Sequence, residues 1–111
     1  MTTRDEIPPG TLDMLILKTL AAGGELHGFE IAEAIRRTTA DVLRVEEGSL
    51  YPALQRQLIK GWILGEWGKT NDNRRARYYR LTASGRKQLV RKVETYQRVA
   101  SAIGLVLRTA Q

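Results

Sequence analysis

Residues 47–62, EGSLYPALQRQLIKGW, carry the strongest structural signal in this chain of 111 residues. Leu50, Leu54 and Leu58 recur every four residues, so they are expected on one side of a helix. A purely structural surface helix would favour Glu, Lys and Ala on the other side. The outer face instead carries hydroxyl, phenol, amide, guanidinium and ammonium groups, on Ser49, Tyr51, Gln55, Arg56 and Lys60, together with Pro52 and Ile59.

This outer face has the chemistry of a DNA-recognition surface. Ser49 and Tyr51 can donate hydrogen bonds to phosphates, and Gln55 or Arg56 can bond base edges. The prolyl residue is tolerated in the first turn, where N–H groups have no acceptor within the helix, and it offers an apolar surface to a thymine methyl group. The positive end of the helix dipole favours a phosphate at the same place. The structural alternative is that Tyr51 and Pro52 pack against the preceding connector.

Two more helices are predicted before this segment. The first follows an arm, residues 1–10, whose prolines exclude a helix, and it has Thr11 as its N-cap. The second opens at His27, and a connector at 40–47 leads to the DNA-suited helix, so the pair predicts a helix-turn-helix. The positions expected to face the core are Leu12, Leu15, Ile16, Thr19 and Leu20, then Phe29, Ile31, Ala32 and Ile35, with Met14 and Leu17 outside the first stripe.

After Gly61 the pattern changes from helical to extended. WILGEWG at 62–68 and ARYYRL at 76–81 are rich in β-branched and aromatic residues, and the polar turn cluster KTNDNRR separates them. The sequence therefore predicts a β-hairpin, which is a wing when it directly follows a helix-turn-helix. A cationic tip can follow a phosphate backbone or enter a minor groove, although a solvated hairpin tip is the plainer reading. The tip cations are Lys69, Arg74, Arg75 and Arg77.

The last predicted helix carries a narrow apolar seam. From Leu89 onward, apolar residues recur in steps of 4, 3, 4, 3 and 4, which is the heptad spacing of a helix that packs on another helix. We therefore expect a winged helix-turn-helix domain at 1–82 and a dimerisation helix at 83–111. The fold class is mainly α with a small β-hairpin, in the order α-α-α-β-β-α, and the last helix offers a seam to another helix. The seam comprises Leu89, Val93, Tyr96, Ala100, Ile103 and Leu107.

Composition and charge agree with a nucleic-acid partner and argue against an enzyme. The net charge is +6, and residues 71–111 alone carry ten basic and two acidic side chains, for +8. The chain has no cysteine and one histidine, His27, which we expect to cap its helix rather than to act in catalysis or bind metal. No carboxylate cluster or phosphate-binding glycine loop is present, so no cofactor or metal is expected. No segment suits a signal peptide or a membrane span, which indicates a cytoplasmic protein.

Four blocks in order, GTLDMLILKTL, LHGFEIAEAIRR, EEGSLYPALQRQLIKGWILGEW and NRRARYYRLTASGRKQL, resemble the PadR family of bacterial transcriptional regulators over about residues 9–90. The resemblance implies a winged helix-turn-helix, a homodimer, and usually a repressor that releases DNA on binding a small effector or on stress. A dimer that places two copies of the third predicted helix in successive major grooves would bind an inverted-repeat operator. DNA contacts carry over to Ser49, Tyr51, Pro52 and Arg56, and in the wing to Arg74, Arg75 and Arg77. The short C-terminal segment resembles the subfamily in which one final helix crosses to the first helices of the partner, which implies a homodimer through the first and last helices.

Three questions stay open at this level. Trp62 and Trp67 either line an apolar pocket for a small apolar or aromatic effector at the dimer interface, or pack in the core and against the sheet. The basic face also permits RNA binding or non-specific binding to nucleic acid. A winged-helix module that docks another protein, with an incidental basic wing, is a further alternative. Discrimination between an operator and scrambled duplex DNA separates these readings.

Overall fold

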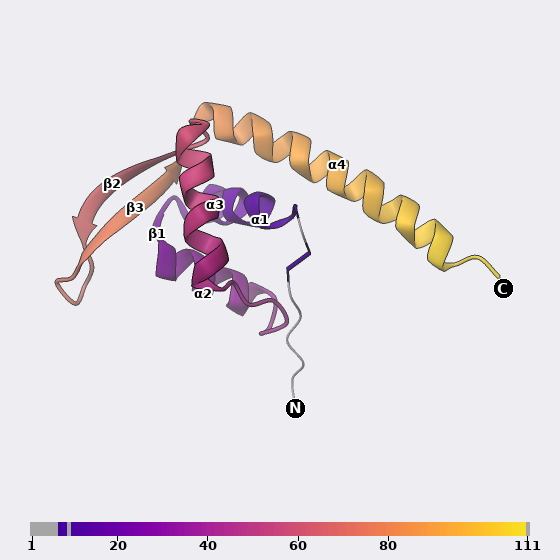
Figure 1. The fold of residues 1–111 in the computed structure, drawn as a ribbon, viewed down its shortest axis with the longest axis horizontal. Helices are drawn as coiled ribbons and strands as arrows, with labels where there is room; N and C mark the ends of the chain where they lie inside the picture. Colours follow the sequence, from indigo (N-terminus) through magenta and orange to yellow (C-terminus); the bar gives the residue numbers. More distant parts are fainter. Residues whose placement is uncertain (1–6, 9, 111) are drawn as a thin grey trace.

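The computed structural model describes residues 7–8 and 10–110, so residues 1–6 and 9 of the predicted arm lie outside the described residues. A bundle of three helices is followed by a projecting hairpin and a long final helix (Figure 1). The helix-turn-helix with its wing is confirmed. The elements are α1 (Leu12–Gly23), β1 (Glu25–His27), α2 (Gly28–Thr38), α3 (Glu47–Ile59), β2 (Ile63–Lys69), β3 (Arg75–Leu81) and α4 (Ala83–Leu107).

One strand was not predicted. Strand β1 pairs antiparallel with β3, and the sheet order is β1-β3-β2. Gly24, with φ of +82°, turns the chain out of α1 so that it can run back along the sheet. Three residues between two helices are too few to show a period of two, so only the pairing with β3, more than fifty residues away along the chain, reveals this strand.

The core lies where α1, α2, α3 and the base of the sheet meet. Leu17, outside the predicted α1 stripe, is fully buried, which agrees with the expectation that such apolar residues mark a helix covered on more than one side; here elements of the same chain cover it. Phe29, predicted to face inward, is 68% exposed, because it lies about 100° around α2 from the buried Gly28. The core residues are Ile16, Leu17, Leu20, Ile31, Ile35, Leu50, Ala53, Leu54, Ile63 and Tyr79.

Two helix starts differ in how they are capped. Thr11 was predicted to cap α1, but its side chain accepts no hydrogen bond from that helix. The Thr11 hydroxyl instead donates to the Pro8 carbonyl oxygen at 2.7 Å. His27 is confirmed as a cap: its Nδ1 accepts from the Glu30 N–H at 3.4 Å, and its own N–H donates to Glu30 Oε1 at 3.1 Å. This reciprocal pair satisfies two N–H groups that the helix itself leaves free.

The buried side of α3 contains an amide. Gln57 has no exposed surface, and neither its Nε2 nor its Oε1 has a hydrogen-bond partner among the described residues. It lies there because it follows Leu50 by seven residues and Ala53 by four, so all three share one face of the helix. A polar residue at a core position gives no hydrophobic signal, and the sequence prediction did not place it inside.

Replacing Gln57 with methionine is therefore expected to raise the free energy of unfolding by about 1 kcal/mol, because a chain of similar shape removes two unpaired polar groups. Urea denaturation followed by circular dichroism measures the change. Gln55→Met, on the exposed side of the same helix, is the matched control and is expected to change stability by less than about 0.5 kcal/mol. A loss of stability in Gln57→Met would mean that the amide has a bonding partner such as a buried water.

Hydrogen bonds hold the start of α4 against the turn that follows α3. Thr82 caps the helix, since its hydroxyl oxygen accepts the Gly85 N–H at 3.0 Å, and its own N–H donates to the Trp62 carbonyl at 3.0 Å. A Cβ atom on Gly85 would overlap that same carbonyl oxygen. Beyond this junction α4 runs away from the body, and Gly85 is its one buried residue (Figure 1).

Candidate nucleic-acid interface

The outer face of α3 is open to solvent, as predicted. Tyr51 is 49% exposed, and Ser49, Pro52, Gln55, Ile59 and Lys60 are exposed as well. The buried row from Leu50 to Gln57 places Gln55 near the middle of the outer face and Arg56 at the edge nearest α1. Here Nη2 of Arg56 lies 2.9 Å from Oδ1 of Asp13 in α1. Arg56 is therefore exposed yet paired, and Gln55 holds the more central position.

The turn between α2 and α3 is fixed by an arginine. Arg36 donates to Glu33 Oε2 at 2.8 Å and to Asp41 Oδ1 at 2.7 Å. The hydrogen bond from Arg36 lowers the pKa of the Glu33 carboxyl group. The backbone turns here through two residues with positive φ, Ala40 at 50° and Asp41 at 69°. These contacts set the direction in which the chain enters α3.

Strand register directs the wing cations to one side. In the β2–β3 ladder, Trp67 lies opposite Arg77 and Lys69 lies opposite Arg75. Residues opposite each other share a face, and that face alternates along each strand. Four pairs from Trp67 and Arg77 along the ladder, buried Ile63 lies opposite Leu81 on the same face, which is the face against the helices. Lys69, Arg75 and Arg77 therefore lie on the helix side of the sheet, toward α3, whereas Arg80, opposite Leu64, lies on the other face.

The wing tip itself is internally bonded. The Thr70 N–H donates to the Arg74 carbonyl at 2.8 Å, and the Arg74 N–H donates to the Thr70 hydroxyl oxygen at 3.2 Å. Asn73 adopts a positive φ of 63°, which asparagine tolerates in tight turns. Arg74 thus closes the tip turn at the start of β3, next to Arg75.

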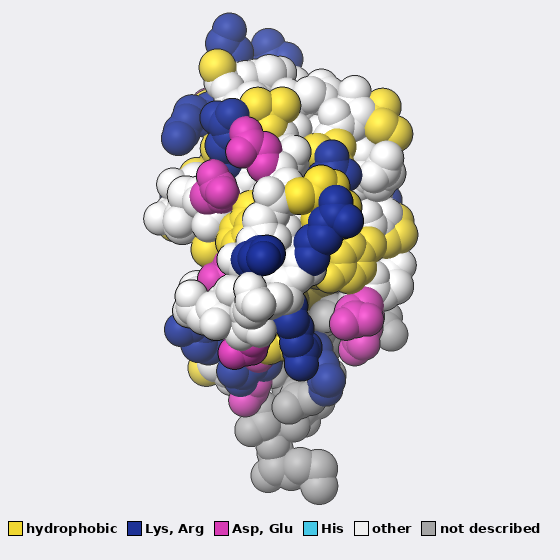
Figure 2. Space-filling view, turned by 90° about the vertical axis from the view of Figure 1, so that its left-hand side faces the viewer, with side chains coloured by type: hydrophobic (Ala, Val, Ile, Leu, Met, Phe, Trp, Pro, Cys, Tyr) yellow, Lys and Arg dark blue, Asp and Glu magenta, His cyan; other side chains and the backbone are white. Residues whose placement is uncertain are grey.

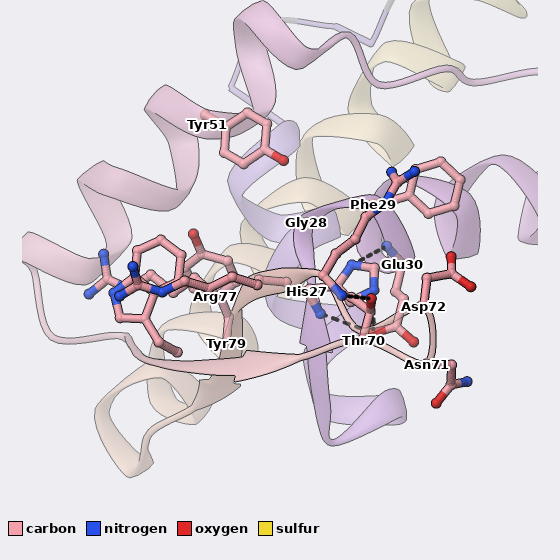
Figure 3. Close-up of a pocket in the computed structure, with 14 residues that line it drawn as sticks. His27, Gly28, Phe29, Glu30, Tyr51, Thr70, Asn71, Asp72, Arg77 and Tyr79 are labelled. Atoms are coloured by element: carbon pink, nitrogen blue, oxygen red, sulfur yellow. Dashed lines mark hydrogen bonds and ion pairs between the residues drawn. The ribbon is translucent and has the colours of Figure 1, made fainter.

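Tyr51 and the wing enclose a concavity of about 880 Å³. Figure 3 shows Tyr51 projecting from α3 over the space between the start of α2 and the wing. A Cβ on Gly28 would lie 3.0 Å from the Tyr51 hydroxyl, so the missing side chain lets the phenol approach the start of α2. The other lining residues are His27, Phe29, Glu30, Trp67, Thr70, Asn71, Asp72, Arg74, Arg75, Ala76, Arg77 and Tyr79.

Arg77 lies at the base of this concavity. Its Nε is buried without a hydrogen-bond partner among the described residues, and a Cβ on Gly65 would come within 2.6 Å of that atom. Glycine at 65 therefore gives the guanidinium room to lie across β2. Burial raises the pKa of the adjacent Tyr79 hydroxyl, which stays protonated at neutral pH.

The face of the molecule on the wing side combines positive charge with apolar surface. Figure 2 shows Lys and Arg side chains lying directly beside hydrophobic ones on this side. Acidic side chains are present there too, so the surface is not uniformly positive. Among residues 7–8 and 10–110, no group of three or more His, Cys, Asp or Glu side chains could hold a metal ion.

The two tryptophans occupy different environments. Trp62 packs against the core, with Lys60 Nζ at 4.5 Å and Lys92 Nζ at 5.1 Å from its ring centroid. Trp67 is 60% exposed and lines the concavity, with the Arg75 guanidinium 4.4 Å from its ring centroid. Trp62 is therefore a core residue, as one of the two predicted readings has it, whereas Trp67 lies on the sheet outside the core and lines the concavity.

The predicted seam on α4 is poorly covered in the single chain. Leu89 packs against the core, but Tyr96, Ile103 and Leu107 are about half exposed or more. Val90, Val99, Leu105 and Val106 add further exposed apolar surface along the same helix. No helix in the described part of the chain is both long and apolar enough to cross a membrane.

Known proteins share this architecture. The model of the transcriptional regulator PadR-like family matches residues 16–91. A transcriptional regulator from Clostridium thermocellum superposes with a TM-score of 0.78 at 32% identity, covering 86% of this chain and 91% of that one. A PadR family regulator from Clostridium difficile gives 0.74 at 27% identity, covering 88% and 99%. An uncharacterised protein of Lysinibacillus sphaericus is 31% identical over 94% of each chain.

Proposed function

Because the chain belongs to the PadR-like family of transcriptional regulators, its general role is the control of transcription through DNA, and we propose that it is a sequence-specific repressor acting as a homodimer. The observation that carries the proposal is the strand register that turns Lys69, Arg75 and Arg77 toward α3. Because α3 and the cationic wing face one concavity, α3 can enter a groove of the DNA while the wing contacts the neighbouring phosphate backbone.

The proposed roles follow from position and chemistry. Ser49 and Tyr51, near the positive end of α3, bond phosphates, while Pro52 meets a thymine methyl. Gln55 reads a base edge from the middle of the outer face, and Lys60 neutralises a phosphate. Arg56 reads a base only after it leaves Asp13, so its contribution depends on the DNA sequence presented. The wing cations Lys69, Arg74, Arg75 and Arg77 bind the phosphate backbone or a minor groove.

Two copies joined along the α4 seam form the proposed functional unit. Residues 1–82 form the DNA-binding domain and residues 83–111 the dimerisation helix. Burying the half-exposed seam residues on a second copy supplies the apolar contact that a small domain needs. Two α3 helices would then enter successive major grooves about 34–36 Å apart, so the operator is an inverted repeat. A regulator of this kind works in the cytoplasm, and a small apolar or aromatic effector could release it from DNA.

The test is a comparison of selected and scrambled DNA. Duplexes selected from a random pool by the full-length protein are measured by fluorescence anisotropy at about 0.15 M salt, alongside scrambled duplexes of equal length. We expect the selected duplex to bind roughly 10³-fold more tightly and to contain an inverted repeat. Arg74→Ala with Arg75→Ala should weaken both duplexes alike and flatten the dependence of affinity on salt.

Four results would contradict the proposal. Equal affinity for selected and scrambled duplexes would indicate a non-specific nucleic-acid-binding protein, and tighter binding to RNA of the same length would favour the RNA reading. No measurable binding to any duplex would favour the protein-interaction module. A selected site without a repeated half-site would contradict the paired arrangement of α3 helices.

A further inference from the structure

Trp67 is an unusual residue for a wing surface. The indole is 60% exposed, although tryptophan is normally buried over most of its large apolar surface. It lies on β2 on the face turned toward α3, where it lines the concavity with Tyr51. An exposed ring at this place indicates a contact that the single chain does not complete.

The ring lies between two arginines of the neighbouring strand. Arg77 is directly opposite Trp67, and Arg75 is its diagonal neighbour on the same face, with its guanidinium 4.4 Å from the ring centroid. Gly65, the next residue of β2 on this face, has no side chain, and Arg77 lies across it. Trp67 is thus the large side chain of β2 against which a wing guanidinium can rest.

Stacking changes what the Arg75 guanidinium can do. A guanidinium held flat on an indole keeps the N–H groups at its edge free for bonding, while its rotational freedom is already reduced. Less side-chain entropy is then lost when the guanidinium binds a phosphate or a base edge. Trp62 offers a contrast, because its ring is packed against the core and carries lysines rather than an arginine.

We propose that Trp67 is a positioning residue of the DNA interface: its ring holds Arg75 with the N–H edge directed to the DNA, and DNA covers the ring in the complex. This inference rests on the proposed function. It gives the wing an aromatic contact with DNA in addition to its charges. It also makes the contribution of Arg75 to DNA affinity depend on Trp67, its diagonal neighbour on β2.

A double-mutant cycle tests the dependence of one residue on the other. Affinities for the selected duplex are measured for the wild type, Trp67→Leu, Arg75→Ala and the double variant over a range of salt. We expect Trp67→Leu to weaken binding about two- to fivefold and to flatten the salt dependence, as loss of the cation itself would. In the Arg75→Ala background the same change should have less than about half of that effect on a logarithmic scale. Trp67→Phe, which keeps a ring, should restore most of the affinity.

Fluorescence provides a second measurement that does not depend on the leucine variant being folded. The chain has two tryptophans, so Trp62→Phe leaves Trp67 as the sole indole emitter. Addition of the selected duplex should reduce acrylamide quenching of Trp67 and shift or quench its emission. Scrambled duplex at the same concentration should do so less.

The outcomes separate this inference from the proposed function. If the wild type does not discriminate between selected and scrambled duplexes, the proposed function fails. If the wild type discriminates but Trp67→Leu binds like the wild type, or its effect is the same with and without Arg75, only the positioning role fails. Unchanged quenching of Trp67 in the bound state would overturn the claim that DNA covers the ring.

Discussion

Val93→Asp combined with Ile103→Asp is expected to convert the proposed dimer to a monomer and to lower operator affinity about 10²- to 10⁴-fold. Both residues lie on the α4 seam, where Ile103 is 54% exposed in the single chain and a second copy would cover it. The free-energy cost of burying an unpaired carboxylate is far larger than the stabilisation from one apolar contact. In a dimer, binding of one copy to its half-site raises the effective concentration of the other copy at the second half-site, and separating the copies removes this gain in affinity.

Sedimentation velocity measures the assembly, and anisotropy measures the affinity. Thr95→Asp with Ala102→Asp is the matched control, because it adds the same two charges on exposed positions about 120–140° around the helix from the seam. The control should remain dimeric and bind the operator. An intact dimer in the seam variant would show that the copies join elsewhere.

Gly85→Ala is expected to cause the largest loss of stability of any single methyl addition in the described chain. The new Cβ would overlap the Trp62 carbonyl oxygen and lie 2.8 Å from Leu81 Cδ1. The carbonyl belongs to the backbone and also accepts the Thr82 N–H, so it cannot move without breaking the α4 junction. A loss of about 3 kcal/mol or more is expected, which is a large part of the total for a domain of this size.

Thermal and urea unfolding measured by circular dichroism test this, with a fall in Tm on the order of 10–20 °C. Gly48→Ala is the control, since a Cβ there has no heavy atom within 4 Å and the site lies in the first turn of α3. It should leave the stability equal or raise it by less than about 1 kcal/mol. Similar stabilities for the Gly85 variant and the wild type would mean that α4 does not sit tightly on the α3–β2 turn.

Sequence patterns predicted those parts of the fold in which apolar residues recur at a regular spacing or a local motif marks a turn or a helix start. The spacing of Leu50 and Leu54 gave the buried side of α3, so the exposed positions of Tyr51 and Gln55 followed from it. The wing could be read from its aromatic strands and polar turn. His27 was predicted to be a structural or capping residue because it stands at the start of the second predicted helix, and the structure adds its reciprocal pair with Glu30.

The features that were missed depend on contacts between distant parts of the chain. The partner of β1 lies on β3, and the partner of Arg56 is Asp13, 43 residues away along the chain. Trp67 is exposed because β2 extends beyond the helices, although its residue type suggests a core position. No local pattern records which end of a strand runs past the body, so register and exposure require the assembled structure.

The junction at Gly85 has a mechanical consequence. A helix of 25 residues is about 37 Å long, so a swing of about 5° at its root displaces its far tip by about 3 Å. If two chains pair through their α4 helices, a small tilt at the start of either α4 produces a larger change in the distance between the two α3 helices. The stiffness of that root therefore governs how much variation in half-site separation the pair accepts.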